Sequence, residues 1–195
     1  MNKVFFDLEW NTGFLDGNSF DEIIEIGAVK TDEEYRQIDG FRRLIRPVIS
    51  RKMNPYIQKI LAITMKDLQG EEPLAAVAKV FFDWCGDCDT LIAWSGNDFG
   101  VLEKNLAHIG MKIPEQLGRY DVQMAYAYRT ENSIRNYALK TAVEAMELPE
   151  PEGQEYHDAY CDAQFTAAIG RALTERYGPL PAVEELQALK NTLVK

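Results

Sequence analysis

The sequence predicts an α/β domain built on a mixed sheet of five strands that is flanked by helices. The first three segments of strand character are joined by connections too short for a crossover helix, so we expect antiparallel neighbours. Two later strand-like segments alternate with helical patterns, which predicts parallel strands. A chain of 195 residues suffices for one sizeable hydrophobic core.

The first three expected strands cover residues 3–10, 22–30 and 41–46, all rich in bulky apolar side chains. Residues 11–19 hold two glycines and an Asp-Gly step, so we expect a turn there. Pro47 is expected to end the third strand, because proline cannot donate to a strand ladder.

From Asn54 onward the apolar residues have helical spacing, interrupted by two short strand patterns. The expected elements are helices around 54–61 and 74–82, a strand over 90–94, a helix from 98, a strand over 120–123, and helices around 122–128, 135–147, 159–177 and after Pro181. A linker rich in proline and acid covers residues 149–153. We expect one domain over residues 1–178, with residues 179–195 packed on it or extending it.

The composition is that of a soluble globular protein, with 46% hydrophobic and 27% charged residues. No apolar run approaches the roughly 20 residues of a membrane span, and the N-terminal apolar stretch is too short for a signal peptide. We therefore expect a cytoplasmic protein without a membrane segment. The lone CxxC of Cys85 and Cys88 lacks the further ligands of a structural zinc site and reads as two incidental thiols.

Taken alone, the net charge of −10 argues against a nucleic-acid partner, because phosphate binding is usually driven by basic patches. Carboxylates that bind divalent cations would reverse the local field where a substrate lies. The acidity therefore fits a protein that binds a short strand end better than one that binds a long duplex.

Two acids, Asp7 and Glu9, lie two residues apart in the first expected strand, so their side chains share one face. Like charges at this spacing oppose ionisation unless a cation lies between them. A solvated strand face is the alternative, but the apolar neighbours Val4, Phe5 and Leu8 predict burial on both faces.

Asp98 follows the fourth strand and a small-residue turn, and it begins a helix whose apolar stripe it shares. Taken alone it reads as an ordinary helix-start aspartate. Asp162 lies on the inward stripe of the helix expected over 159–177. His157 would precede that helix on a loop, with Asp158 as its cap, although alone it reads as a surface histidine after a linker.

These residues together resemble the DEDDh 3′–5′ exonucleases, a family that includes RNase T, oligoribonuclease and the proofreading subunit of bacterial DNA polymerase III. The first family motif, Asp-x-Glu, is matched by Asp7 and Glu9, the second by Asp98, and the third, His-x4-Asp, by His157 and Asp162. The resemblance covers about residues 1–175, with order and spacing kept, and implies a ribonuclease H-like sheet.

The resemblance implies a two-metal site for Mg²⁺ or Mn²⁺ in which Asp7 bridges the ions, Glu9 and Asp162 complete the first site, and Asp98 completes the second. His157 would be the general base, a role that suits histidine near neutral pH. The expected substrate is the 3′ end of single-stranded DNA or RNA, and the expected product is a nucleoside 5′-monophosphate.

The chain departs from the family after the first motif, where many members have a threonine pair and a glycine. This chain has Trp10, Asn11, Thr12 and Gly13 there, followed by Phe14, so Trp10, Asn11, Thr12 and Phe14 are candidate substrate contacts. Trp10 or Phe14 would stack on a terminal base, or else serve as core or rim aromatics. Two other functions stay open, a metal-dependent hydrolase of small nucleotides and an inactive adaptor with the same fold.

Overall fold

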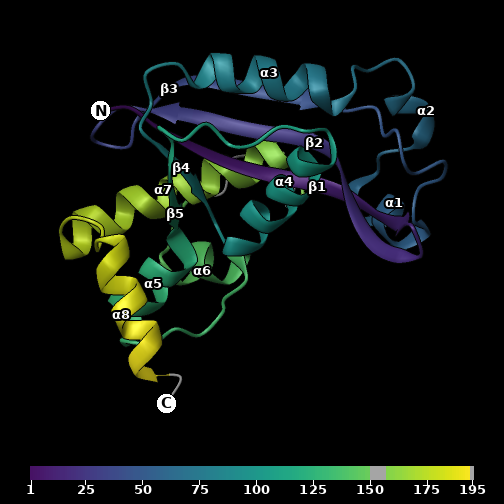
Figure 1. Cartoon of the computed structure of the whole chain (residues 1–195). Helices are drawn as coiled ribbons and strands as arrows, with labels where there is room; N and C mark the ends of the chain where they lie inside the picture. The colour runs from purple at the N-terminus through teal and green to yellow at the C-terminus, as the bar shows by residue number, and fades with distance from the viewer. Residues whose placement is uncertain (150–156, 194–195) are drawn as a thin grey trace.

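The computed structural model describes residues 1–149 and 157–193 and contains the predicted mixed sheet of five strands (Figure 1). The strand order is β3-β2-β1-β4-β5, with β1 at the centre. β1 pairs antiparallel with β2 and parallel with β4, while β3 joins β2 antiparallel and β5 joins β4 parallel. The predicted order, three antiparallel strands and then two parallel ones, is confirmed.

The strands are β1 (Lys3–Leu15), β2 (Asn18–Thr31), β3 (Gln37–Leu44), β4 (Thr90–Ala93) and β5 (Gly118–Asp121). The helices are α1 (Pro55–Leu61), α2 (Met65–Leu68), α3 (Leu74–Cys85), α4 (Gly96–His108), α5 (Val122–Glu131), α6 (Leu139–Ala145), α7 (Ala159–Tyr177) and α8 (Val183–Leu193). In these described residues, none of the helices combines the length and hydrophobicity that crossing a bilayer requires.

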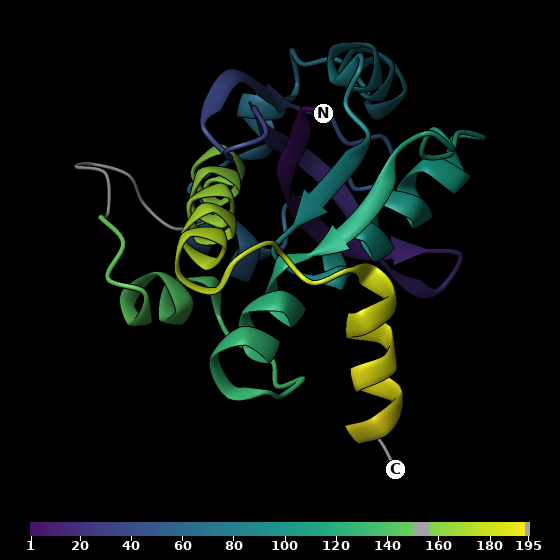
Figure 2. The same ribbon diagram turned by 90° about the vertical axis from the view of Figure 1, so that its left-hand side faces the viewer.

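Alternate residues of β1 supply two hydrophobic cores, one on each face of the sheet. Val4, Phe6 and Leu8 pack with α3 and α4, whereas Phe5 packs with α5, α6 and α7. Figure 2 shows α7 and α4 on opposite sides of the strands. Because Asp7 and Glu9 share the face of Phe5, they point toward α7.

Several predicted boundaries were wrong. The turn predicted over residues 11–19 is confined to Asp16 and Gly17, both with positive φ, because the two strands continue as a long hairpin. β3 begins and ends earlier than the predicted 41–46, and β5 ends at Asp121 rather than at 123.

The sixth helix is shorter than the predicted 135–147, because residues 134–138 form no regular structure and Ala138, directly before the helix, has an extended backbone. The carbonyl of Tyr137 accepts hydrogen bonds from Trp94 Nε1 (3.0 Å) and Gln123 Nε2 (2.8 Å). Most of the predicted linker over 149–153 lies outside the described residues.

The C-terminal segment packs on the same body as the rest of the chain. Leu186 of α8 is buried in the core that contains α7. The hydroxyl of Tyr120 donates to the carbonyl of Pro181 (2.8 Å), and that of Tyr128 donates to Glu185 Oε1 (2.8 Å). The division of the chain at residue 178 stays a prediction.

Candidate active site

The central strand β1 carries the first two candidate residues in a fixed position. Asp7 lies opposite Gly27 of β2, and Glu9 lies opposite Glu25. The register shifts directly after Glu9, at a bulge before Trp10. Because the neighbouring apolar side chains are fully buried, the strand cannot rotate its acids to another face without losing its core contacts.

Asp98 reaches the same edge of the sheet through the turn after β4. Since β4 runs parallel to β1, its carboxyl end points in the direction in which β1 carries Asp7 and Glu9. Ser95 caps α4 by accepting a hydrogen bond from the amide of Asn97, and its hydroxyl donates to Asp98 Oδ2 (3.3 Å). Asp98 is therefore the third residue of α4, whereas the sequence predicted that it begins the helix.

α7 supplies Asp162 from its first turn. The predicted cap is confirmed, because Asp158 Oδ1 accepts hydrogen bonds from the amides of Tyr160 and Cys161 (both 3.1 Å). Asp162 is only 9% exposed, and its Oδ2 accepts a hydrogen bond from the amide of His157 (3.2 Å). Its other oxygen, Oδ1, is buried and has no hydrogen-bond partner among the described residues.

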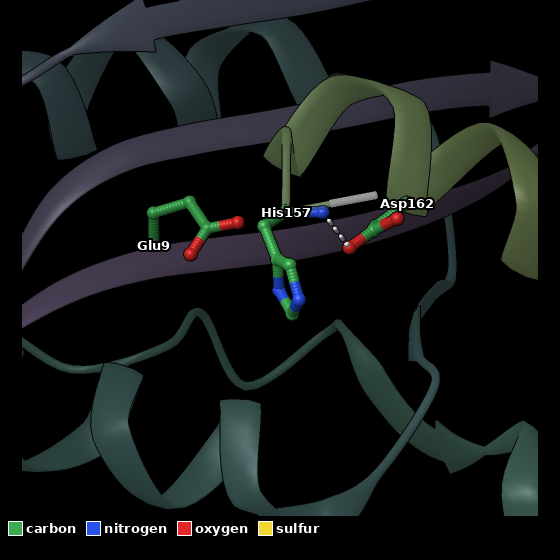
Figure 3. A group of neighbouring side chains, drawn as sticks. All are labelled: Glu9, His157 and Asp162. Carbon is green, nitrogen blue, oxygen red and sulfur yellow. Dashed lines mark hydrogen bonds between the residues drawn. The ribbon is translucent and has the colours of Figure 1, made fainter. Parts of the chain in front are cut away.

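His157 lies just before α7 with its side chain exposed, and its backbone has a φ of 71°. This left-handed conformation is uncommon outside glycine, and such strain is often found at functional sites. Ligand atoms of Glu9, His157 and Asp162 all lie within 4.8 Å of one another. Figure 3 shows the histidine between the two carboxylates in this view, with its amide bonded to Asp162.

All five predicted site residues line one open cleft with a volume of about 270 Å³. An apolar part of the lining, which we call the apolar wall, comes from Ile57, Ile60 and Leu61 of α1, none of whose residues is buried. The sequence predicted a helix at the position of α1 but not its place in the cleft lining. The cleft is lined by Asp7, Leu8, Glu9, Trp10, Ile57, Ile60, Leu61, Ser95, Asn97, Asp98, His157 and Asp162.

The carboxyl groups of the cleft hold their protons far more tightly than free acids. Burial raises the pKa of Glu9 from 4.5 to about 8, and the charge of Asp162 adds to the shift. Burial likewise raises the pKa of Asp162 to about 7 and that of Asp98 to about 6. The pKa of Asp7 is raised well above its usual value by burial and then by the charges of Asp98, Asp162 and Glu9. A cation placed among them would reverse these shifts.

The cluster fits a divalent cation better than it fits any group of the chain itself. Within the described parts of the chain, none of the four cleft carboxylates forms an ion pair; the nearby ion pairs use Glu25 and Asp158. No described residue forms a hydrogen bond with the buried Oδ1 of Asp162, which is costly unless a ligand occupies that position. Carboxylate oxygens are the donors preferred by Mg²⁺ and Mn²⁺.

Arg42 of β3 joins the sheet to the start of α7. Its Nε donates to Glu25 Oε1 (2.8 Å), and its terminal nitrogen lies 2.6 Å from Asp158 Oδ2. Glu25 is almost fully buried beside Glu9, and Asp158 directly follows His157. This clamp, formed by Glu25, Arg42 and Asp158, therefore fixes the main chain next to the candidate base.

The four predicted substrate contacts differ in their surroundings. Trp10 lines the cleft. Asn11 is fully buried, and its side chain bonds to the main chain of Lys52 and Asn54, so it supports the cleft wall and does not face a substrate. Thr12 donates its hydroxyl to Asp21 Oδ1 (2.7 Å), and Phe14 lies outside the cleft on the hairpin with 78% exposure.

The cysteines take no part in the cleft. Cys85, Cys88 and Cys161 are free and buried, and burial raises the pKa of Cys85 to about 12. A thiol of this kind is a poor nucleophile at neutral pH. The interpretation of the CxxC as two incidental thiols stays a prediction.

The fold defines the class of protein. The nuclease domain of 3′hExo, described as a DEDDh family member bound to rAMP, superposes with a TM-score of 0.79 at 16% identity, covering 92% of this chain and 94% of that one. Exonuclease I of E. coli, solved in complex with a dA16 oligonucleotide, superposes with a TM-score of 0.69 at 18% identity, covering 99% of this chain and 43% of that one. At these identities the similarity shows an exonuclease fold.

The family follows from the sequence comparison. The model of the RNase T exonuclease family matches residues 4–169, so the chain belongs to this family. A PolC-type DNA polymerase III of Clostridium perfringens is 28% identical over 168 residues, which cover 85% of this chain. The chain spans only 11% of the length of that relative.

Proposed function

We propose that the protein is a metal-dependent 3′–5′ exonuclease of the DEDDh type that removes nucleoside 5′-monophosphates from single-stranded DNA or RNA. The main support is one observation: four carboxylates that form no ion pair with the described residues line a single open cleft together with one exposed histidine. The 3′ direction is proposed from the resemblance of the three motifs and from the fold shared with 3′hExo.

The carboxylates would hold two divalent cations, with Asp7, Glu9 and Asp162 at one and Asp7 and Asp98 at the other. Such cations, when bound, supply positive charge against the negative charge that builds on the attacking and leaving oxygens. Asp162 is suited to this role because one of its oxygens is held by the amide of His157, while the other has no hydrogen-bond partner in residues 1–149 and 157–193.

His157 would accept the proton of the attacking water. Its ring is exposed at the cleft and lies within reach of the two carboxylates, while its main chain is tied to Asp162. A general base of this kind contributes roughly 10²–10⁴-fold to the rate.

The apolar wall from α1 would hold the terminal base. Ile57, Ile60, Leu61 and Trp10 line the same cleft as the acids. Contacts of this type tolerate any base, since every base has an apolar face. The volume of about 270 Å³ lies just under the ~300–1,000 Å³ of typical small-ligand pockets, so we expect one nucleotide to be held at a time.

We further propose a cytoplasmic location. Three free, buried cysteines fit a compartment in which thiols stay reduced.

The proposal is tested by a timed digest of 5′-labelled and 3′-labelled single strands of DNA and RNA with Mg²⁺, Mn²⁺ or EDTA. We expect stepwise shortening of the 5′-labelled strand and early release of a labelled mononucleotide from the 3′-labelled strand, only with metal. Asp7→Asn should abolish both, whereas Asp83→Asn, at an exposed acid on α3, should not. Digestion of dinucleotides alone would favour a small-nucleotide hydrolase, and metal-dependent stabilisation without cleavage would favour an adaptor.

A further inference from the structure

The charges of this acidic chain are unevenly distributed along the sequence. Residues 40–66 contain seven basic residues and no acidic one, whereas the other 168 residues hold 14 basic residues and all 31 acidic ones. The seven are Arg42, Arg43, Arg46, Arg51, Lys52, Lys59 and Lys66. A net charge of −10 therefore conceals one segment that is strongly positive.

Two neighbouring cations of this segment, Arg51 and Lys52, are free to meet a ligand. Both side chains are exposed, and neither forms an ion pair with the described residues. In contrast, Arg42 is engaged by two carboxylates. The first acid after the segment, Asp67, accepts hydrogen bonds from Thr64 at the cap of α2 and does not neutralise them.

The fold places these two cations beside the cleft. The side chain of Asn11 on β1 bonds to the carbonyl of Lys52 (3.1 Å) and to the amide of Asn54 (2.7 Å). A side chain at Gly13 would lie 2.8 Å from Ser50 Oγ, so the hairpin and this segment are in contact. α1, which begins at Pro55, forms the apolar wall of the cleft and lies beside the end of β1 (Figure 1).

Two large aromatic side chains flank the cations and contribute little to the core. Phe14 on the hairpin is 78% exposed, and Tyr56 in the first turn of α1 is 70% exposed. Exposed aromatic rings next to free cations are typical of surfaces that bind single strands, where the rings stack on bases and the cations contact phosphates. Neither ring has an evident role in the packing of the fold.

We propose that Phe14, Arg51, Lys52 and Tyr56 form a binding surface for the single strand that continues on the 5′ side of the nucleotide held in the cleft. The inference rests on the proposed function, and it adds that the enzyme prefers longer strands. Cations outside the cleft would offset the repulsion between the acidic body of the protein and the incoming phosphates.

The test compares kcat/KM for a dinucleotide and for a 5′-labelled single strand of about 16 nucleotides, the upper range of single-strand site sizes. The variant Arg51→Glu/Lys52→Glu should lower kcat/KM for the long strand by roughly tenfold or more, mainly through KM, and leave the dinucleotide unchanged. The control Lys79→Glu/Arg171→Glu changes the net charge equally at exposed sites on α3 and α7 and should leave both substrates unchanged.

A second measurement separates this surface from the chemistry of the cleft. Binding of the long strand to Asp7→Asn is followed by fluorescence anisotropy at several salt concentrations, with and without the double charge reversal. Loss of two phosphate contacts should reduce the slope of log Kd against log salt by about 1.4. Phe14→Ala/Tyr56→Ala should weaken this binding by roughly 30-fold, the lower end of the range for two stacked bases.

Equal kcat/KM for both substrates in the unmodified protein would overturn the inference, as would an unchanged salt slope in the charge-reversed variant. If neither substrate is cleaved but the anisotropy differences appear, the surface stands and the proposed activity fails.

Discussion

Replacement of one cleft carboxylate should make the metal-free protein more stable. Asp162→Asn keeps the size of the side chain and an oxygen that can accept the hydrogen bond from the amide of His157. It removes the charge and replaces the partnerless Oδ1 with an amide group. We therefore expect the variant to unfold at higher denaturant concentration than the unmodified protein in EDTA at pH 8.

The magnitude follows from the raised pKa of Asp162. Its pKa rises from 3.8 in the unfolded chain to about 7 in the folded protein, so the folded state binds this proton more tightly. The contribution of Asp162 to the free energy of unfolding therefore falls as the pH rises from about 4 to about 7, and it does not change further above pH 7. At about 1.4 kcal/mol per pKa unit the loss is at most about 4 kcal/mol, and we expect about 2 kcal/mol after relaxation of the cleft.

The assay is thermal and urea unfolding of both proteins between pH 4 and pH 8, in EDTA and in Mg²⁺. The variant should melt about 4–8 °C higher than the unmodified protein at pH 8 in EDTA, and the difference should vanish near pH 4. Mg²⁺ should stabilise the unmodified protein more than the variant. A variant that is less stable at pH 8 in EDTA, or a difference independent of pH, would refute the assignment of Asp162 as a buried, uncompensated acid.

Three further substitutions test other parts of the site. His157→Gln should lower turnover by roughly 10²–10⁴-fold while Mg²⁺ still raises the melting temperature. Loss of the Mg²⁺-induced rise together with turnover would argue against a role of His157 as the general base. Arg42→Ala should lower the free energy of unfolding by roughly 2 kcal/mol and should also lower kcat, as measured by urea unfolding and initial rates. Arg42→Lys should recover part of both losses, and the control Arg43→Ala should show neither. Gly27→Ala should destabilise the fold by about 3 kcal/mol or more, whereas Gly100→Ala, which has open space around it, should be neutral or slightly stabilising in the same unfolding assay.

The elements that hold the acids were predictable because their patterns are local. Alternation of apolar residues places Asp7 and Glu9 on one face of β1, and the helical stripe of α7 places Asp162 toward the sheet. The cap at Asp158 follows from its position before a helical pattern. The three acids therefore needed no long-range information to be assigned to their faces.

The cleft wall and the long hairpin were less predictable, since both depend on contacts between distant segments. Periodicity shows which side of α1 is apolar, but it does not show that Ile57 and Leu61, which pack against a small core, also line a cleft. The polar residues after Trp10 resemble a turn, yet they form strand because Asn11 is bonded to the segment at Lys52 and Asn54. These residues meet only when the chain is folded.

The site depends on a close approach between a helix and the sheet at one glycine. Gly27 lies directly opposite Asp7, and a side chain there would come within 2.1 Å of the main-chain nitrogen of Tyr160. The missing side chain lets the first turn of α7 rest on β2, which brings Asp162 and His157 to the level of Asp7. The carboxylates repel one another, so packing at this contact holds them together. Removal of one charge should therefore stabilise the metal-free fold, while added bulk at Gly27 should disrupt the site.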